Sequence, residues 1–172
     1  MRRFTLSSVL TIAASMLLAG CAGTVAMTPA PDAKNVGCAN VSVRLPDTVG
    51  NLPERATDAQ ATGAWGDPTA VLLWCGVAAP GPTTMPCVEV NGVDWIIDDS
   101  QAPKYRFTTF GRSPTVTVVL DNTKVSGTTA ITDLSQAVSV TQQVDQCLSI
   151  EDVPSGSDSS SGGSSPSPSP TQ

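Results

Sequence analysis

The chain has 172 residues and a formal net charge of −6, and 40% of its residues are apolar although only 4% are aromatic. A chain of this length holds one small domain. Because it is acidic and has no run or stripe of basic residues, it is not expected to bind nucleic acid. Histidine is absent, which excludes Ser-His-Asp and Cys-His triads and every zinc site that needs imidazole.

The N-terminal segment has the parts of a bacterial lipoprotein signal. Arg2 and Arg3 precede an apolar run over residues 9–19, which is too short to span a hydrocarbon core of ~30 Å. The motif Leu18-Ala19-Gly20-Cys21 follows, and its small residues let a peptidase cut between Gly20 and Cys21. We expect a signal peptide over residues 1–20 and a diacylglycerol, with acyl chains such as palmitate, on the Cys21 thiol.

The alternative to lipidation is an ordinary secretory signal that is cut near Ala22. That alternative is disfavoured because it would leave Cys21 as an odd, reactive thiol. Lipidation would place the protein on the outer face of the bacterial cytoplasmic membrane. Loss of the signal with its two arginines leaves 7 basic and 15 acidic residues, a net charge of −8.

Composition divides the remaining chain into three parts. Residues 21–36 are small, polar and proline-containing, which predicts a flexible tether. Residues 37–153 form a single extracytoplasmic domain. Residues 154–172 are rich in Ser, Pro and Gly, which predicts a disordered tail. Its Ser-Pro repeats could carry O-linked sugars, although a bare solvated tail is favoured.

Four cysteines remain when Cys21 is set apart, and an even number outside the cytoplasm predicts disulfides. Three pairings are possible. We favour Cys75–Cys87, which closes a short loop rich in turn residues, and Cys38–Cys147, which joins the two ends of the domain. A redox or metal site is the alternative, but the chain has no Cys-x-x-Cys.

The first half of the domain predicts two strands and a helix. Alternation of Val41, Val43 and Leu45 with polar residues indicates a half-buried strand from Cys38 to Pro46. Residues 52–64, rich in Ala, Gln, Glu and Arg after a proline, favour a short helix. The apolar run 70–75 is typical of a central strand.

The second half predicts a hairpin, two further strands and a last helix. Asn91-Gly92 tolerates a type I′ turn between the alternating flanks 88–90 and 93–95, so Val88, Val90, Val93 and Trp95 should face the core. Runs 105–110 and 116–120 are β-rich, and residues 111–114 should interrupt them. A helix is expected to begin at Asp133. The fold class is therefore α+β: a small, mostly antiparallel, disulfide-stapled sheet with one or two short helices.

Several short motifs share their order and spacing with a known family. They are Cys38 through Leu45-Pro46, Ala64-Trp65-Gly66-Asp67-Pro68, Trp74-Cys75-Gly76-Val77, Cys87 with Gly92-Val93-Asp94-Trp95, and Thr108-Thr109-Phe110-Gly111-Arg112-Ser113-Pro114. From about Cys38 to Cys147 the chain resembles the actinobacterial lipoprotein family catalogued as domain of unknown function thirty-five fifteen. Where this chain has Trp74, the family pattern often has a basic or aliphatic residue. The resemblance implies an envelope location and the cysteine pattern, and it implies no activity or ligand.

The candidate binding face lies around a Thr-rich strand. Arg106 and Arg112 flank this strand, and Tyr105 and Phe110 supply rings. An arginine fork beside hydroxyls and a ring can hold a carboxylate, a phosphate or a glycan. The structural alternative is that both arginines pair with some of the fifteen acidic residues.

We predict a non-enzymatic binding or accessory module of the cell envelope, whose partner is an envelope protein or a cell-wall glycan. No catalytic residue, metal or cofactor is predicted. The alternative is an unrecognised envelope hydrolase, or an accessory factor to one. Its candidate groups are a carboxylate pair, Asp98/Asp99 with Asp94 or Glu89, or a Ser-Lys dyad with Lys104 or Lys124, none of which stands in a recognised motif.

Overall fold

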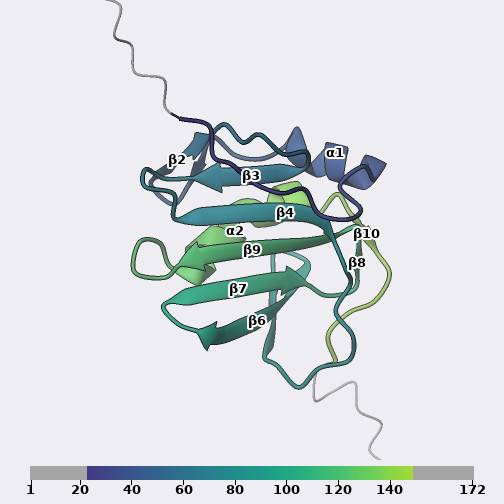
Figure 1. The fold of residues 1–172 in the computed structure, drawn as a ribbon. Helices are drawn as coiled ribbons and strands as arrows, with labels where there is room; N and C mark the ends of the chain where they lie inside the picture. The colour runs from purple at the N-terminus through teal and green to yellow at the C-terminus, as the bar shows by residue number, and fades with distance from the viewer. Residues whose placement is uncertain (1–22, 149–172) are drawn as a thin grey trace, which may run out of the picture.

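The computed structural model describes residues 23–148, so Gly20, Cys21, the signal peptide and the Ser/Pro/Gly tail lie outside the described residues. An eight-stranded antiparallel sheet runs through the domain in the order β1-β2-β3-β4-β9-β7-β6-β5, of which Figure 1 labels the strands from β2 to β6, and β8 and β10 form a small separate pair. In chain order the elements are α1 (Val36–Ser42), β1 (Thr48–Val49), β2 (Leu52–Arg55), β3 (Thr62–Trp65), β4 (Val71–Val77), β5 (Cys87–Val90), β6 (Val93–Gln101), β7 (Lys104–Thr109), β8 (Arg112–Ser113), β9 (Thr115–Asp121), α2 (Gly127–Val138) and β10 (Gln142–Gln143). The predicted α+β class is confirmed.

Both helices pack on one face of the sheet, which we call the covered face. Alternate residues of the central strands β4 and β9 are fully buried there, among them Leu73 and Val118, which are Cα partners. The same core contains Val41 of α1 and Leu134 of α2. The opposite, uncovered face looks toward the viewer in Figure 1, with α2 behind the sheet.

Two predictions for the first half of the domain are wrong. The expected strand from residue 38 is the helix α1, because the Asn35 side chain accepts the Gly37 N–H as an N-cap, and Cys38 and Val41 then share a buried helical face. The expected helix over 52–64 is two strands, β2 and β3, which pair with each other. Burial of Trp65 and its pairing within the sheet outweigh the helix propensity of the intervening residues.

The predicted hairpin is confirmed, with two local differences. Asn91 and Gly92 both have positive φ, of 52° and 76°, and Val90 pairs with Val93 across them. Val88, expected in the core, is 37% exposed because β5 is the edge strand of the sheet. Strand β6 also continues beyond the predicted flank 93–95 to Gln101, with a bulge between Asp98 and Gln101.

The final helix begins earlier than predicted. Helix α2 starts at Gly127, with Ser126 as its N-cap accepting the Thr129 N–H, and Asp133 lies in its middle. The Asp133 carboxylate instead accepts the Gly50 N–H at 2.7 Å. Asp133 therefore joins α2 to the β1–β2 turn instead of starting the helix.

The segment predicted as a tether packs against the domain. Val25 donates its N–H to Ala56 at 2.8 Å, and Asp32 donates to Gly76 at 2.9 Å. The Trp74 indole donates to the Thr28 carbonyl at 3.1 Å. In Figure 1 this segment crosses the uncovered face in front of β3 and β4, so the structured chain begins well before residue 37.

All four predicted cysteines form disulfides, but the favoured pairing is wrong. Cys38 bonds to Cys75, with Cα atoms 5.5 Å apart, and Cys87 bonds to Cys147, with Cα atoms 6.4 Å apart. Although Cys75 and Cys87 are close in sequence, three strands lie between β4 and β5. Four strand spacings amount to about 19 Å, far beyond the reach of a disulfide.

Candidate functional site

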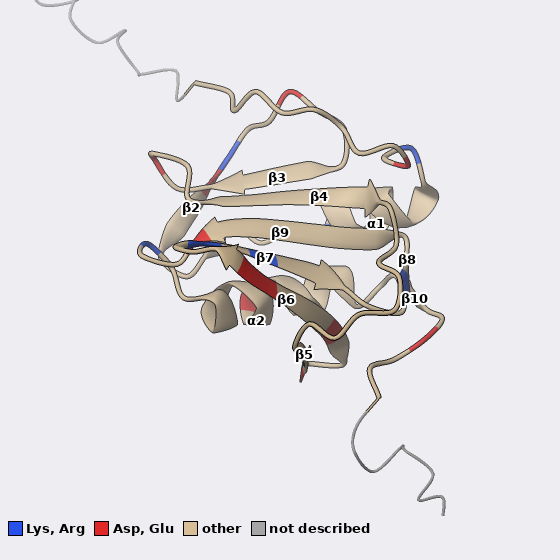
Figure 2. Cartoon of the chain, turned by 60° about the horizontal axis from the view of Figure 1, so that its bottom comes forward, with Lys and Arg blue, Asp and Glu red and all other residues tan. Residues whose placement is uncertain are grey.

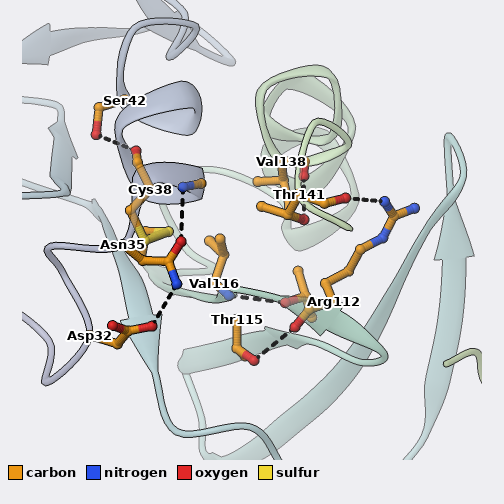
Figure 3. Close-up of a disulfide and its surroundings, with 12 residues drawn as sticks. Asp32, Asn35, Cys38, Ser42, Arg112, Thr115, Val116, Val138 and Thr141 are labelled. Carbon is orange, nitrogen blue, oxygen red and sulfur yellow. Dashed lines mark hydrogen bonds between the residues drawn. A yellow bond between two sulfur atoms is a disulfide. The ribbon is translucent and has the colours of Figure 1, made fainter. Parts of the chain in front are cut away.

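Arg112 is a structural residue, so its assignment to the binding face is wrong. Its side chain is only 9% exposed. The guanidinium donates to the Thr141 carbonyl at 2.9 Å (Figure 3), to the Ser139 carbonyl at 3.2 Å and to the Gly92 carbonyl. It therefore ties the end of α2 to the β5–β6 hairpin, and both terminal nitrogens of its guanidinium already have partners.

The alternation of side chains along β7 places the other predicted binding residues on different surfaces of the sheet. Tyr105 and Phe107 lie on the covered face with ring centroids 6.4 Å apart. Arg106, between them in β7, therefore points to the uncovered face, where it is exposed. Phe110 follows the end of β7 and is half-buried. The four residues predicted as one binding face thus occupy different surfaces.

A cavity of about 330 Å³ opens on the uncovered face beside Arg106. Its floor is the sheet, where Thr108 and Thr117 share a hydrogen bond of 2.9 Å between their hydroxyls. Its wall is the end of β4 and the β4–β5 loop (residues 78–86). The lining residues are Val77, Ala78, Pro80, Met85, Ile96, Asp98, Arg106, Thr108 and Thr117. We call this space the sheet cavity.

A second cavity of about 450 Å³ adjoins the first, because Met85 and Ile96 line both. The Cys87–Cys147 disulfide and Phe110 form part of its lining, together with the C-terminal residues 145–148. We call this space the disulfide cavity.

Opposite charges lie on neighbouring strands at one end of the sheet cavity. Asp98 of β6 and Arg106 of β7 are Cα partners, and Figure 2 shows the acidic stretch of β6 beside the basic residues of β7. Hydrogen bonds from Ser100, and in smaller part the charge of Arg106, lower the pKa of Asp98. The cavity therefore offers one cation and one carboxylate at neutral pH.

The geometry argues against the carboxylate pairs considered from the sequence. Asp98 lines the sheet cavity, whereas Asp99 is exposed and is not among the lining residues. Asp94 shares the face of Asp98, but the two lie four positions apart along β6, about 13 Å, which is more than the 5–9.5 Å of glycosidase pairs. A lowered pKa also makes Asp98 a poor proton donor at neutral pH.

The other acids near the hairpin have local structural partners. Asp94 accepts the Cys147 N–H at 2.9 Å. Glu89 lies opposite Asp94 and accepts the Gly92 N–H. These contacts hold the hairpin and the C-terminal segment together. They give Asp94 and Glu89 structural roles, so no catalytic role is needed to explain either carboxylate.

A family model described as "Protein of unknown function (DUF3515)" matches residues 5–147. The chain belongs to this family. The match confirms the family resemblance seen in the motifs, and the family's description assigns no activity. No curated protein and no solved structure matches the chain. Within residues 23–148, no helix is long and apolar enough to cross a membrane.

The sequence did not predict the sheet cavity, although the sequence pattern of one of its strands contains part of the information. The run 104–109 alternates, so that Arg106 and Thr108 fall on one face and Tyr105 and Phe107 on the other. This alternation already places Arg106 and Tyr105 on opposite faces of the sheet. The contribution of Asp98 and of the β4–β5 loop depends on strand order, which the sequence pattern does not encode.

Proposed function

We propose that this protein is a lipid-anchored binding module of the cell envelope, and that its partner occupies the sheet cavity. The observation that carries the proposal is an open cavity on the uncovered face, lined by Arg106, by two hydroxyls and by an apolar wall. The proposed partner is an extracytoplasmic protein or a cell-wall glycan, and no catalytic step is invoked.

Arg106 is the group best placed to hold such a partner. Within residues 23–148 the one salt bridge joins Arg55 to Asp67 and leaves Arg106 out of it. An arginine with an exposed fork can bind a carboxylate, a phosphate or sugar hydroxyls through paired N–H groups. The neighbouring wall of Val77, Pro80 and Met85 would add apolar contact.

The lipid anchor is supported by the motif that ends at Cys21, and the nearby residue Gly23 contacts the domain. The Gly23 carbonyl accepts a hydrogen bond from Arg55 of β2 at 2.6 Å. Only Ala22 lies between Cys21 and Gly23, and two residue steps reach at most about 7 Å. Diacylglycerol on Cys21 would hold the domain close to the membrane, with the β2 end of the sheet nearest the lipid.

The proposal is tested by cross-linking the full-length protein in native membranes and identifying the cross-linked partners by mass spectrometry. Arg106→Ala should lose a reproducible partner. The matched control is Arg44→Ala, because Arg44 is also exposed but bonds only to the Asn40 carbonyl of α1. An equal loss in both variants, or an unchanged partner in Arg106→Ala, would count against the cavity.

The anchor is tested separately. Cys21→Ser should release the protein from the membrane fraction and abolish incorporation of labelled fatty acid. Retention of label in Cys21→Ser would contradict lipidation at this residue without bearing on the sheet cavity.

A further inference from the structure

Three metal-ligand atoms meet beside the disulfide cavity. The sulfurs of Cys87 and Cys147 and a carboxylate oxygen of Asp94 all lie within 4.8 Å of one another. Each comes from a different part of the fold: the edge strand β5, its neighbour β6 and the segment after β10. The Cys147 N–H donates to Asp94 Oδ2 at 2.9 Å, so the carboxylate is held beside the sulfurs.

The two disulfides differ in their access to a reductant. Cys38 of α1 and Cys75 of β4 are both fully buried. Cys87 and Cys147 are partly exposed and line a cavity of about 450 Å³. Thiol–disulfide exchange needs a thiolate to reach a sulfur atom, so an external dithiol can attack Cys87–Cys147 while Cys38–Cys75 stays protected.

Reduction would convert the cluster into a set of ligands for a soft divalent cation. A dithiol reductant gives two electrons and two protons to Cys87–Cys147 and becomes a disulfide itself, leaving two thiols. A cation such as Zn²⁺ then displaces both thiol protons to solvent and binds two thiolates and the Asp94 carboxylate. Two sulfurs and one oxygen favour Zn²⁺ or Cd²⁺ over Mg²⁺ or Ca²⁺, and water can supply a fourth ligand.

The surroundings favour a cation. Glu89 lies directly opposite Asp94 in the hairpin, and Asp145 lines the same cavity. Both add negative potential, and the cavity leaves space for the entering ion. We propose that Cys87, Cys147 and Asp94 form a zinc-type site that is closed while the disulfide is intact and opens when a dithiol reduces it.

The test uses the full-length protein in detergent, reduced with a phosphine, desalted without oxygen and titrated with Cd²⁺. Sulfur-to-metal absorption in the ultraviolet reports the binding. We expect reduction to release two new thiols per chain, and one equivalent of Cd²⁺ to bind. Before reduction no such absorption is expected. The Cys87→Ser/Cys147→Ser variant should show none under either condition.

The Asp94→Asn variant tests whether Asp94 is a metal ligand or whether the two thiols alone bind Cd²⁺. Loss of this ligand should weaken Cd²⁺ binding at least about tenfold, since even outer-shell partners are worth that much. Asp99→Asn is the matched control: it removes the same charge from the same strand at an exposed position, and its affinity should stay unchanged.

Three results would overturn the proposal. Equal Cd²⁺ affinity in Asp94→Asn and the unchanged protein would mean that any two thiols suffice. Release of four new thiols by mild reduction would mean that both disulfides are equally accessible. Loss of the β-sheet circular dichroism signal on reduction would mean that the reduced chain has no site to offer. None of these outcomes bears on the sheet cavity.

Discussion

The two faces of the eight-stranded sheet have different chemistry, and each face has its own disulfide. On the covered face, Cys38–Cys75 is fully buried among apolar residues from β4, β9 and both helices. On the uncovered face, Cys87–Cys147 is partly exposed beside charged and hydroxyl side chains. The covered face therefore holds most of the apolar core, while the uncovered face holds the exposed polar and charged groups.

The largest contrast is expected between the two disulfides. Sequence separations of 37 and 60 residues give similar loop entropies, each about 4 kcal/mol in the chain-entropy model. Cys38→Ser/Cys75→Ser also buries two hydroxyls, each costing about 1–3 kcal/mol if unpaired. It should lower the free energy of unfolding more than Cys87→Ser/Cys147→Ser. Urea denaturation checks this, and the reverse order would contradict it.

Neighbouring leucines in β4 give a matched pair for the two faces. Leu73 is 1% exposed on the covered face, and Leu72 is half-buried on the uncovered face. Leu73→Ala should cost about 3 kcal/mol through lost burial and a residual cavity. Leu72→Ala should cost about 1 kcal/mol because less area leaves the protein interior. Denaturant unfolding of both variants measures these losses. Equal shifts of the two denaturant midpoints would show that both faces are packed alike.

The two arginines predicted as one binding face should behave oppositely. Arg112→Ala removes a buried donor to three carbonyls and should destabilise the fold by about 2–3 kcal/mol. Arg106 is exposed, so Arg106→Ala should change the free energy of unfolding by less than about 0.5 kcal/mol. Thermal unfolding of both variants checks this. A destabilised Arg106→Ala would assign that residue a structural role.

The smallest effect concerns pH. The pKa of Asp98 is lowered from 3.8, chiefly by hydrogen bonds from Ser100. Its stabilising contribution is therefore present above the ordinary pKa and is lost as the pH falls through the lowered value. The pKa of Glu54 is raised from 4.5 by burial and by Asp47. Its contribution is present below the ordinary pKa and is lost as the pH rises through the raised value.

These opposite signs can be measured with two isosteric variants. Asp98→Asn should be slightly less stable than the unchanged protein at neutral pH, with the difference vanishing in acid. Glu54→Gln should be slightly more stable at neutral pH. Urea denaturation across acid and neutral pH measures both. A Glu54→Gln variant that loses stability at neutral pH would reverse the assigned direction for that carboxylate.

The sequence predicts the second half of the domain better than the first. Asn91-Gly92 and the strands around it depend on local turn chemistry and period, and these were confirmed. In the first half, α1 depends on a cap at Asn35 and on a bond to Cys75, 37 residues away from Cys38. Alternation at Val41, Val43 and Leu45 is compatible with either element, so tertiary contacts decide it.

The disulfide pairing and the sheet cavity escaped prediction for the same reason. Short sequence separation suggested Cys75–Cys87, but the strand order places β9, β7 and β6 between them. The same order brings Asp98 beside Arg106 and folds the β4–β5 loop over them. The residue types alone were enough to predict Arg106 as a binding residue. The residues around it depend on the strand order, which no local sequence pattern specifies.

The most direct test of the binding proposal places a photoreactive amino acid at Met85, which is 43% exposed and lines both cavities. The control position is Val43, which is 78% exposed beside α1. In cells that make the full-length protein, a discrete adduct should form from position 85 and not from position 43, and Arg106→Ala should abolish it. Equal adducts at both positions, or an adduct indifferent to Arg106→Ala, would contradict a partner in the sheet cavity.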